Sequence, residues 1–283
     1  MAQVVGVHGI AQEQLGRHQL LASWQAALAD GIEVALDARN PPIPSFDIAY
    51  YGNLFLSAAA GGAPMTKAAT LTSPDIVSDD ELDFLDAALA EIPGDEDAVP
   101  AKGLSGVPAP LRPLLRRLAS RYDLKVLLVL VAALRQVRVY LDDDDLAAGI
   151  RSRVLAAIGD GCDVLIGHSL GSVVAFETLA LNPEVRVGAL ITAGSPLSMK
   201  TVATRLRATD QYPPGRPLPG PARSWVNVLD EADPVTAGGR VSRIWPAARD
   251  YTVDNGNQPH AITRYLSKRI SGQSVLAGIS STQ

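Results

Sequence analysis

Short apolar runs alternate with longer segments that carry an apolar stripe along most of this chain. The runs predict strands and the stripes predict helices, because a parallel strand is buried on both faces while a helix buries one. The predicted strands cover residues 3–7, 46–51, 162–166, 187–192, 224–229 and 249–253. Strands that alternate with helices favour an α/β fold with a mostly parallel sheet flanked by helices.

The apolar stripes place the helices between these strands. They are predicted over residues 17–30, 78–92, 123–140, 142–158, 172–181 and from 260 onward. Gly31 is expected to end the first helix. Ser78 and Glu81 form an S-x-x-E capping box at the start of the second. The last helix is expected to open at His260 and to carry Tyr265 on its apolar face.

The pattern changes between residues 54 and 122. Ala, Gly and Pro dominate there, and no strand signal appears. Connections of this length are usually functional lids or disordered segments. We therefore expect one domain over residues 1–283, in which 54–122 is a lid-like insertion that lies over the sheet.

The stretch G-H-S-L-G at residues 167–171 is an instance of the G-x-S-x-G nucleophile elbow. The pattern alone is weak, and a chance turn is the alternative. The context strengthens it, because a predicted strand precedes the stretch and a predicted helix follows. Side chains at Gly167 or Gly171 would collide with the neighbouring strand or helix. Ser169 is therefore the candidate nucleophile.

A serine needs a base, and histidine is the usual one. The four histidines are His8, His18, His168 and His260. The motif's chain order is Ser, then Asp or Glu, then His, so only His260 qualifies. His168 is expected to point away from the reaction, His18 to lie on the surface, and His8 to have a structural role.

The third member of a triad is a carboxylate that orients the histidine. Six acidic residues lie in the window, namely Asp210, Asp230, Glu231, Asp233, Asp250 and Asp254. We favour Asp233, which comes just past a strand end and before Pro234, a residue that stiffens the turn. Asp230 is the rival, but a residue so close to the strand tends to pack into the sheet.

An acyl-transfer site also needs donors for an oxyanion. One donor is expected from the backbone N–H of Leu170, which follows the nucleophile. The other is expected from the first strand-to-helix loop, where Ile10 is the candidate. Leu170 and Ile10 are thus the predicted oxyanion hole.

Four segments together resemble the α/β-hydrolase family, and more narrowly the bacterial lipase- and esterase-like serine hydrolases. They are V-V-G-V-H-G-I, G-H-S-L-G-S-V-V-A-F-E, W-V-N-V-L-D-E-A-D-P-V and N-Q-P-H-A-I-T-R-Y-L. The resemblance implies that Ser169, Asp233 and His260 are nucleophile, acid and base, with Ile10 and Leu170 as oxyanion hole. It does not cover residues 54–122.

Two features depart from that family. Its first two strands have no counterpart, since residues 4–7 already lead into the oxyanion loop. The loop reads H-G-I rather than H-G-G-G, which argues against the hormone-sensitive-lipase-like group.

Composition further limits which classes of protein and which partners the chain fits. Hydrophobic residues are 47% of the 283 and charged residues 19%, as in folded globular chains, and a net charge of −5 gives no sign of a nucleic-acid partner. Cys162, the single cysteine, is expected to pack in the core. The longest apolar run, 126–134, is about half of what a bilayer span needs. No signal-peptide pattern is visible, so we expect a cytoplasmic protein without a membrane span.

The expected reaction is hydrolysis of a carboxylic ester through an acyl-Ser169 intermediate. The partner is a small-molecule acyl substrate, and no cofactor or metal is implied. A metal site at the aspartates 142–145 is disfavoured, because adjacent helical residues do not face one another. The same triad also serves thioesterases, acyltransferases, macrocyclising enzymes and peptidases or amidases. A non-catalytic binding module is the remaining alternative.

Overall fold

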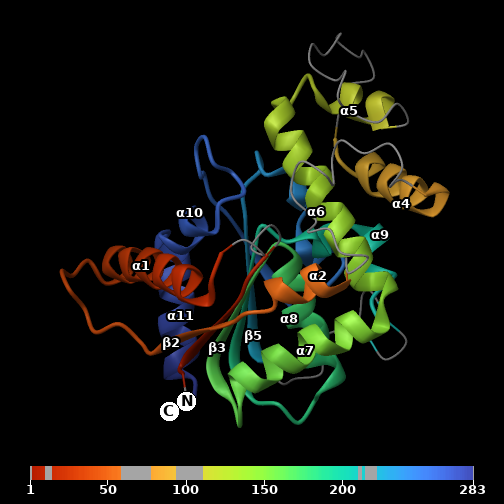
Figure 1. Cartoon of the computed structure of the whole chain (residues 1–283). Helices are drawn as coiled ribbons and strands as arrows, with labels where there is room; N and C mark the ends of the chain where they lie inside the picture. The colour runs from red at the N-terminus through yellow and green to blue at the C-terminus, as the bar shows by residue number, and fades with distance from the viewer. Residues whose placement is uncertain are drawn as a thin grey trace.

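Six parallel strands form a single sheet at the centre of the computed structural model (Figure 1). The structure describes residues 2–9, 15–58, 78–93, 111–209, 212–213 and 222–282. The strands are β1 (Val4–Val7), β2 (Phe46–Ala49), β3 (Cys162–His168), β4 (Val187–Ala193), β5 (Ala222–Leu229) and β6 (Ala248–Thr252). Their order is β2-β1-β3-β4-β5-β6, and every neighbouring pair is parallel. The prediction of an α/β fold with a parallel sheet is confirmed.

Helices cover both faces of this sheet. They are α1 (Arg17–Leu36), α2 (Gly52–Ala58), α4 (Asp79–Ala90), α5 (Arg112–Leu118), α6 (Leu124–Asp142), α7 (Asp144–Ile158), α8 (Leu170–Leu181), α9 (Lys200–Ala203), α10 (Ile262–Leu266) and α11 (Arg269–Ser280). One apolar cluster joins α1 and α11 to one face, and a larger cluster joins α6, α7 and α8 to the other. This coverage explains why β1 and β4 are buried at every position.

Gly31 does not end the first helix, contrary to the prediction. Helix α1 continues to Leu36, and Asp37 ends it in the left-handed conformation at φ 52°. Gly31 instead lies where α1 meets the C-terminal helices. A Cβ atom on Gly31 would stand 2.1 Å from the carbonyl oxygen of Leu266, and one on Gly272 would stand 2.2 Å from the carbonyl oxygen of Gly31. The glycine is thus explained by close packing and not by termination.

The C-terminal segment forms two helices rather than the single helix predicted. His260 precedes α10, which spans only Ile262–Leu266, and α11 starts at Arg269. Tyr265 is buried as expected. His260 therefore lies in a loop, where its ring is free to face the carboxyl edge of the sheet.

Half of the predicted capping box forms at the start of α4. The hydroxyl of Ser78 accepts the backbone N–H of Glu81 at 3.2 Å. The carboxylate of Glu81 pairs with Arg135 and, at 3.7 Å, with Arg138. A buried ion pair between α4 and α6 thus takes the place of the reciprocal bond.

The predicted insertion is described in part, because residues 59–77 and 94–110 lie outside the described ranges. Helices α4 and α5 stand beyond the carboxyl ends of the strands, next to the upper part of α6 (Figure 1). Phe84 and Leu115, from these two helices, belong to the same apolar cluster as Val7 and Leu165 of the sheet. The described helices of the insertion therefore share the core of the sheet.

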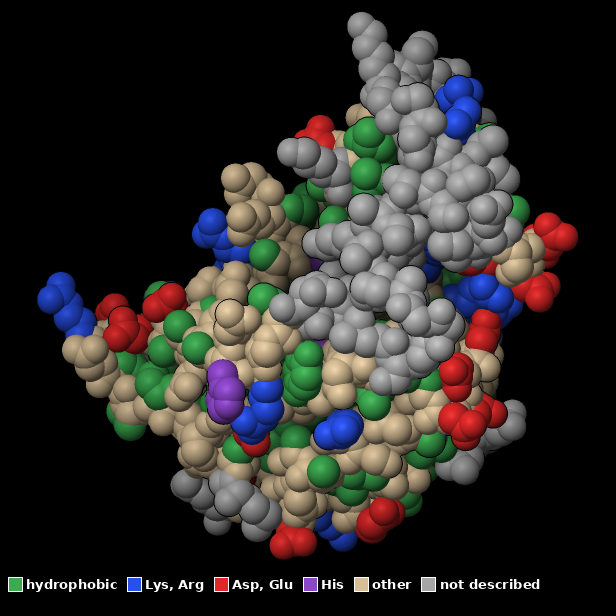
Figure 2. Space-filling model, in the orientation of Figure 1, with side chains coloured by type: hydrophobic (Ala, Val, Ile, Leu, Met, Phe, Trp, Pro, Cys, Tyr) green, Lys and Arg blue, Asp and Glu red, His purple; other side chains and the backbone are tan. Residues whose placement is uncertain are grey.

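The surface charges and the lengths of the helices remain to be described. Acidic and basic side chains are interspersed over the face seen in Figure 2. None of the helices in the described ranges combines the length and apolar character that crossing a bilayer requires.

Candidate active site

Ser169 lies at a sharp turn between β3 and α8. Its backbone has φ 54° and ψ −128°, a positive φ that costs a non-glycine residue about 1–3 kcal/mol. A Cβ on Gly167 would stand 2.5 Å from the Cα of Ser172, and one on Gly171 would stand 2.1 Å from the carbonyl oxygen of Val7. Only glycine fits at either position, as the elbow pattern predicts.

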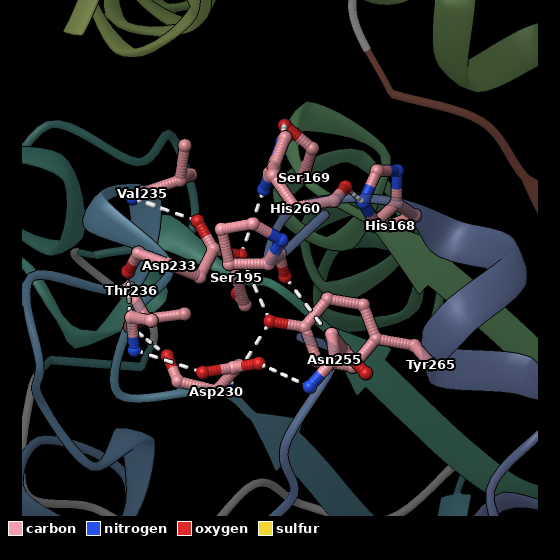
Figure 3. Close-up of polar contacts among 12 residues, drawn as sticks. His168, Ser169, Ser195, Asp230, Asp233, Val235, Thr236, Asn255, His260 and Tyr265 are labelled. Carbon is pink, nitrogen blue, oxygen red and sulfur yellow. Dashed lines mark hydrogen bonds and ion pairs between the residues drawn. The ribbon is translucent and has the colours of Figure 1, made fainter. Parts of the chain in front are cut away.

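Three loops at the carboxyl edge of the sheet bring Ser169, His260 and Asp233 together (Figure 3). The Nε2 atom of His260 lies 3.0 Å from the Oγ atom of Ser169, and its Nδ1 atom lies 2.8 Å from the Oδ2 atom of Asp233. An ionised carboxylate only accepts hydrogen bonds, so Nδ1 carries the proton. Nε2 is then free to accept the proton of the serine hydroxyl.

Asp233 is completely buried, and both of its carboxylate oxygens are bonded. Oδ1 accepts the backbone N–H of Val235 at 3.0 Å. Oδ2, which faces His260, also accepts the hydroxyl of Tyr265 at 2.8 Å. Burial and the charge of Asp233 raise the pKa of Tyr265, so its hydroxyl stays protonated and remains a donor.

Tyr265 is a site residue that the sequence did not reveal. Its position on a buried stripe indicated packing, and nothing in the spacing pointed its hydroxyl at Asp233. The one available signal is general: a buried tyrosine usually bonds its hydroxyl to a partner.

Asp230, the rival acid, has a different set of partners. Its Oδ2 accepts the N–H of Asn255 at 2.6 Å, and its Oδ1 accepts the N–H of Ala232 at 2.8 Å. The side-chain amide of Asn255 donates to the carbonyl of Pro259 at 3.0 Å. Asp230 thus braces the loop that leads to His260, while Asp233 touches the imidazole.

Within the described residues, none of the other histidines forms a hydrogen bond with the serine hydroxyl. His168 bonds through Nε2 to the carbonyl of His260 at 3.0 Å, and burial lowers its pKa well below the usual value. His8 bonds through Nδ1 to the carbonyl of Gly9, and its Nε2 accepts the N–H of Tyr51. Burial lowers the pKa of His8 to about 4. His18 is exposed on α1.

Leu170 begins α8, directly after Ser169. The first N–H groups of a helix lack intrahelical acceptors, so the N–H of Leu170 is suited to bind an anion. Ile10, the other predicted oxyanion donor, lies outside the described residues, as does Asp210. The loop that leads to Ile10 approaches Ser169 closely, because a Cβ on Gly9 would stand 2.7 Å from the Cβ of Ser169.

Three of the four aspartates at 142–145 have structural partners. Asp143 caps α7 by accepting the N–H of Leu146 at 2.9 Å, and Asp142 and Asp144 form ion pairs with arginines. Within the described ranges, no group of three or more His, Cys, Asp or Glu side chains is arranged to hold a metal ion. Cys162 is buried at the start of β3, and burial raises its pKa to about 12.

The structure has pockets at both ends of the strands. The larger, about 590 Å³, lies at the opposite end of the strands, next to Cys162 and Val187. The second, about 420 Å³, is walled in part by Ala232 and Pro259. These two residues immediately precede Asp233 and His260 in the sequence, so the second pocket is bounded by the loops that carry these two side chains.

No family model matches the chain, and neither does any curated protein or solved structure.

Proposed function

We propose that the protein is a serine hydrolase of the α/β-hydrolase fold that cleaves a carboxylic ester. The observation that carries this proposal is the hydrogen-bonded series from Ser169 through His260 to Asp233, with Ser169 at a positive φ. Nucleophile, base and orienting acid in mutual contact are the geometric signature of acyl-transfer catalysis. The parallel sheet, with its elbow between β3 and α8, supports the fold assignment.

The first half of the reaction acylates the enzyme. Ser169 Oγ attacks the ester carbonyl while its proton passes to Nε2 of His260. The tetrahedral adduct then collapses, the bond to the alcohol oxygen breaks, and Nε2 returns the proton to that oxygen. Asp233 holds the ring orientation and stabilises the charged imidazolium. In the second half, a water molecule attacks the acyl carbonyl and passes a proton to Nε2 of His260. The bond to Oγ then breaks, the carboxylic acid leaves, and Nε2 returns the proton to Ser169 Oγ.

Oxyanion stabilisation is assigned to the N–H groups of Leu170 and Ile10. The position of Leu170 at the start of α8 supports the first of these. Removing one such donor typically costs on the order of a hundredfold or more in turnover.

Labelling with a fluorophosphonate, read by intact mass, tests the activated serine. We expect one adduct on the wild type and none on Ser169→Ala or His260→Ala. His18→Ala is the matched control, because His18 is exposed on α1 and bonds to none of the three residues, and it should label like the wild type. A folded wild type that takes no adduct would contradict the proposal and favour a binding module.

A leaving-group series separates ester hydrolysis from the related activities. Oxygen esters, thioesters and amides with the same acyl chain are compared by kcat/KM. The proposal expects turnover of the oxygen ester. A strong preference for the thioester would assign a thioesterase instead, and a preference for the amide would assign an amidase.

A further inference from the structure

The pocket of about 420 Å³ at the loops of Asp233 and His260 is bounded by two different parts of the molecule. Ala232 and Pro259 form one wall, from the loops that carry the acid and the base. Arg121 and Tyr122 form the other, from the turn between α5 and α6. The pocket therefore joins the catalytic loops to the described part of the insertion.

Tyr122 has an unusual hydroxyl. The residue is only 7% exposed, and its hydroxyl oxygen is buried without any hydrogen-bond partner in the described structure. The three other buried tyrosines all have one: Tyr51 donates to the carbonyl of His8, Tyr140 to Glu177 and Tyr265 to Asp233. An unpaired buried hydroxyl is costly to a fold, so this one requires an explanation.

The surroundings keep this hydroxyl protonated. Burial is the main cause that raises the pKa of Tyr122, the nearby guanidinium of Arg121 lowers it, and the charge of Asp233 raises it. The guanidinium lies 5.8 Å from the centre of the tyrosine ring. The result is a neutral donor, close enough to the triad for the charge of Asp233 to reach it.

The direction of the reaction indicates which half of the substrate meets this donor. On the proposed mechanism, Nε2 of His260 returns a proton to the departing alcohol oxygen, so the alcohol leaves on the His260 side. The pocket is walled by the loop that ends at His260. It also carries charges of both signs, from Arg121, Asp123 and Glu231, so it suits a polar but uncharged group.

We propose that this pocket binds the alcohol half of the ester and that the hydroxyl of Tyr122 donates a hydrogen bond to an oxygen of that alcohol. The substrate class is then an ester of a polyhydric or otherwise hydroxylated alcohol, in preference to a plain alkyl ester. This inference rests on the proposed hydrolase function.

The test compares two esters with the same acyl chain and the same three-carbon alcohol skeleton. Glyceryl monobutyrate carries free hydroxyls on the alcohol, and propyl butyrate carries none. The wild type should prefer the glyceryl ester. In Tyr122→Phe we expect kcat/KM for the glyceryl ester to fall about tenfold, as for loss of one neutral hydrogen bond, with less than about a twofold change for the propyl ester.

The melting temperature Tm tests whether the hydroxyl of Tyr122 instead has a structural role. Tyr122→Phe deletes a hydroxyl without a partner, so its Tm should equal or exceed that of the wild type. Tyr251→Phe, which removes a hydroxyl from a side chain that is 40% exposed on β6, is the matched control and should change neither quantity. A lower Tm for Tyr122→Phe would point to a structural hydroxyl and overturn the inference.

The remaining outcomes separate this inference from the proposed function. Equal losses on both esters, or no loss on either, overturn the inference alone. A wild type that labels with the fluorophosphonate but turns over neither ester also overturns it alone. A folded wild type that neither labels nor hydrolyses overturns both.

Discussion

Asp233 and Asp230 lie three positions apart, and both are buried, yet they meet different donors. Asp233 faces an imidazole and a phenol, whereas Asp230 accepts two backbone N–H groups. The same substitution should therefore have different consequences at the two positions.

Asp233→Asn should lower kcat by on the order of 10⁴, because the amide favours the wrong tautomer of His260. Asp230→Asn should mainly lower the free energy of unfolding, by about 1–3 kcal/mol, since an amide NH₂ would face a backbone N–H donor. Ester hydrolysis and urea unfolding of both variants measure the two effects. If Asp230→Asn suffered the larger kinetic loss, the roles would have to be exchanged.

Ser169 and His260 could be predicted from the sequence because the sequence offers one candidate for each. The elbow pattern marks one serine, and one histidine follows it in the chain. Asp233 was harder to predict, since six acidic residues share the window and only the fold decides which one meets the imidazole. The hydroxyls of Tyr265 and Tyr122 could not be predicted, because a tyrosine on a buried stripe gives no sign of what its oxygen contacts.

At the scale of elements, helical glycines illustrate how packing overrides propensity. Gly31 lies inside α1 and Gly149 inside α7, and alanine is the better helix former at both by about 1 kcal/mol. A Cβ at Gly149 would meet only the Cδ1 atom of Leu54 at 3.7 Å, whereas a Cβ at Gly31 would stand 2.1 Å from a backbone oxygen.

Gly31→Ala should therefore lower Tm, because α1 must move away from the segment between α10 and α11. Gly149→Ala is the matched control and should raise the free energy of unfolding by up to about 1 kcal/mol. Differential scanning calorimetry of both variants checks the pair. A Tm increase in Gly31→Ala would mean that the helices separate at no cost, contrary to the contact seen here.

Helix α8 shows a second limit of pattern reasoning. The sequence predicts a helix after the elbow, and the helix is found, but Glu177 in its middle has no exposed surface. Its carboxylate accepts the hydroxyl of Tyr140 at 2.5 Å and pairs with Arg151 at 3.0 Å and Arg207 at 3.5 Å. These partners come from α6, α7 and the segment after α9, so no local pattern predicts them. Since a buried charge needs such partners, the network ties these three segments to α8.

For the whole molecule, the class and strand positions follow from the sequence, because buried parallel strands leave short apolar runs. The boundaries at Gly31 and after His260 do not, because tertiary contacts set them. The described helices of the insertion could be predicted only where capping and periodicity coincide, as at Ser78. The strand order also cannot be predicted from the local pattern, since it depends on how the connections between strands cross the sheet.

Two buried histidines give the whole molecule a pH dependence. Burial lowers the pKa of His8 to about 4, and lowers that of His168 well below its usual range. An unfolded chain binds protons at both positions below about pH 6.5, while the folded chain does not. The unfolded state is then favoured by acid, so the free energy of unfolding should fall as pH drops from about 6.5 toward 4. For His8 alone the fall is of order 3 kcal/mol.

Urea unfolding at a series of pH values measures this slope. His8→Asn removes one of the two groups, so its slope between pH 6.5 and 4 should be shallower than that of the wild type. If His8→Asn kept the full slope, the pKa of His8 in the folded protein would have to be close to its unfolded value. The ring would then be open to water rather than enclosed between Gly9 and Tyr51, and the loop beside Ser169 would be packed differently from the arrangement seen here.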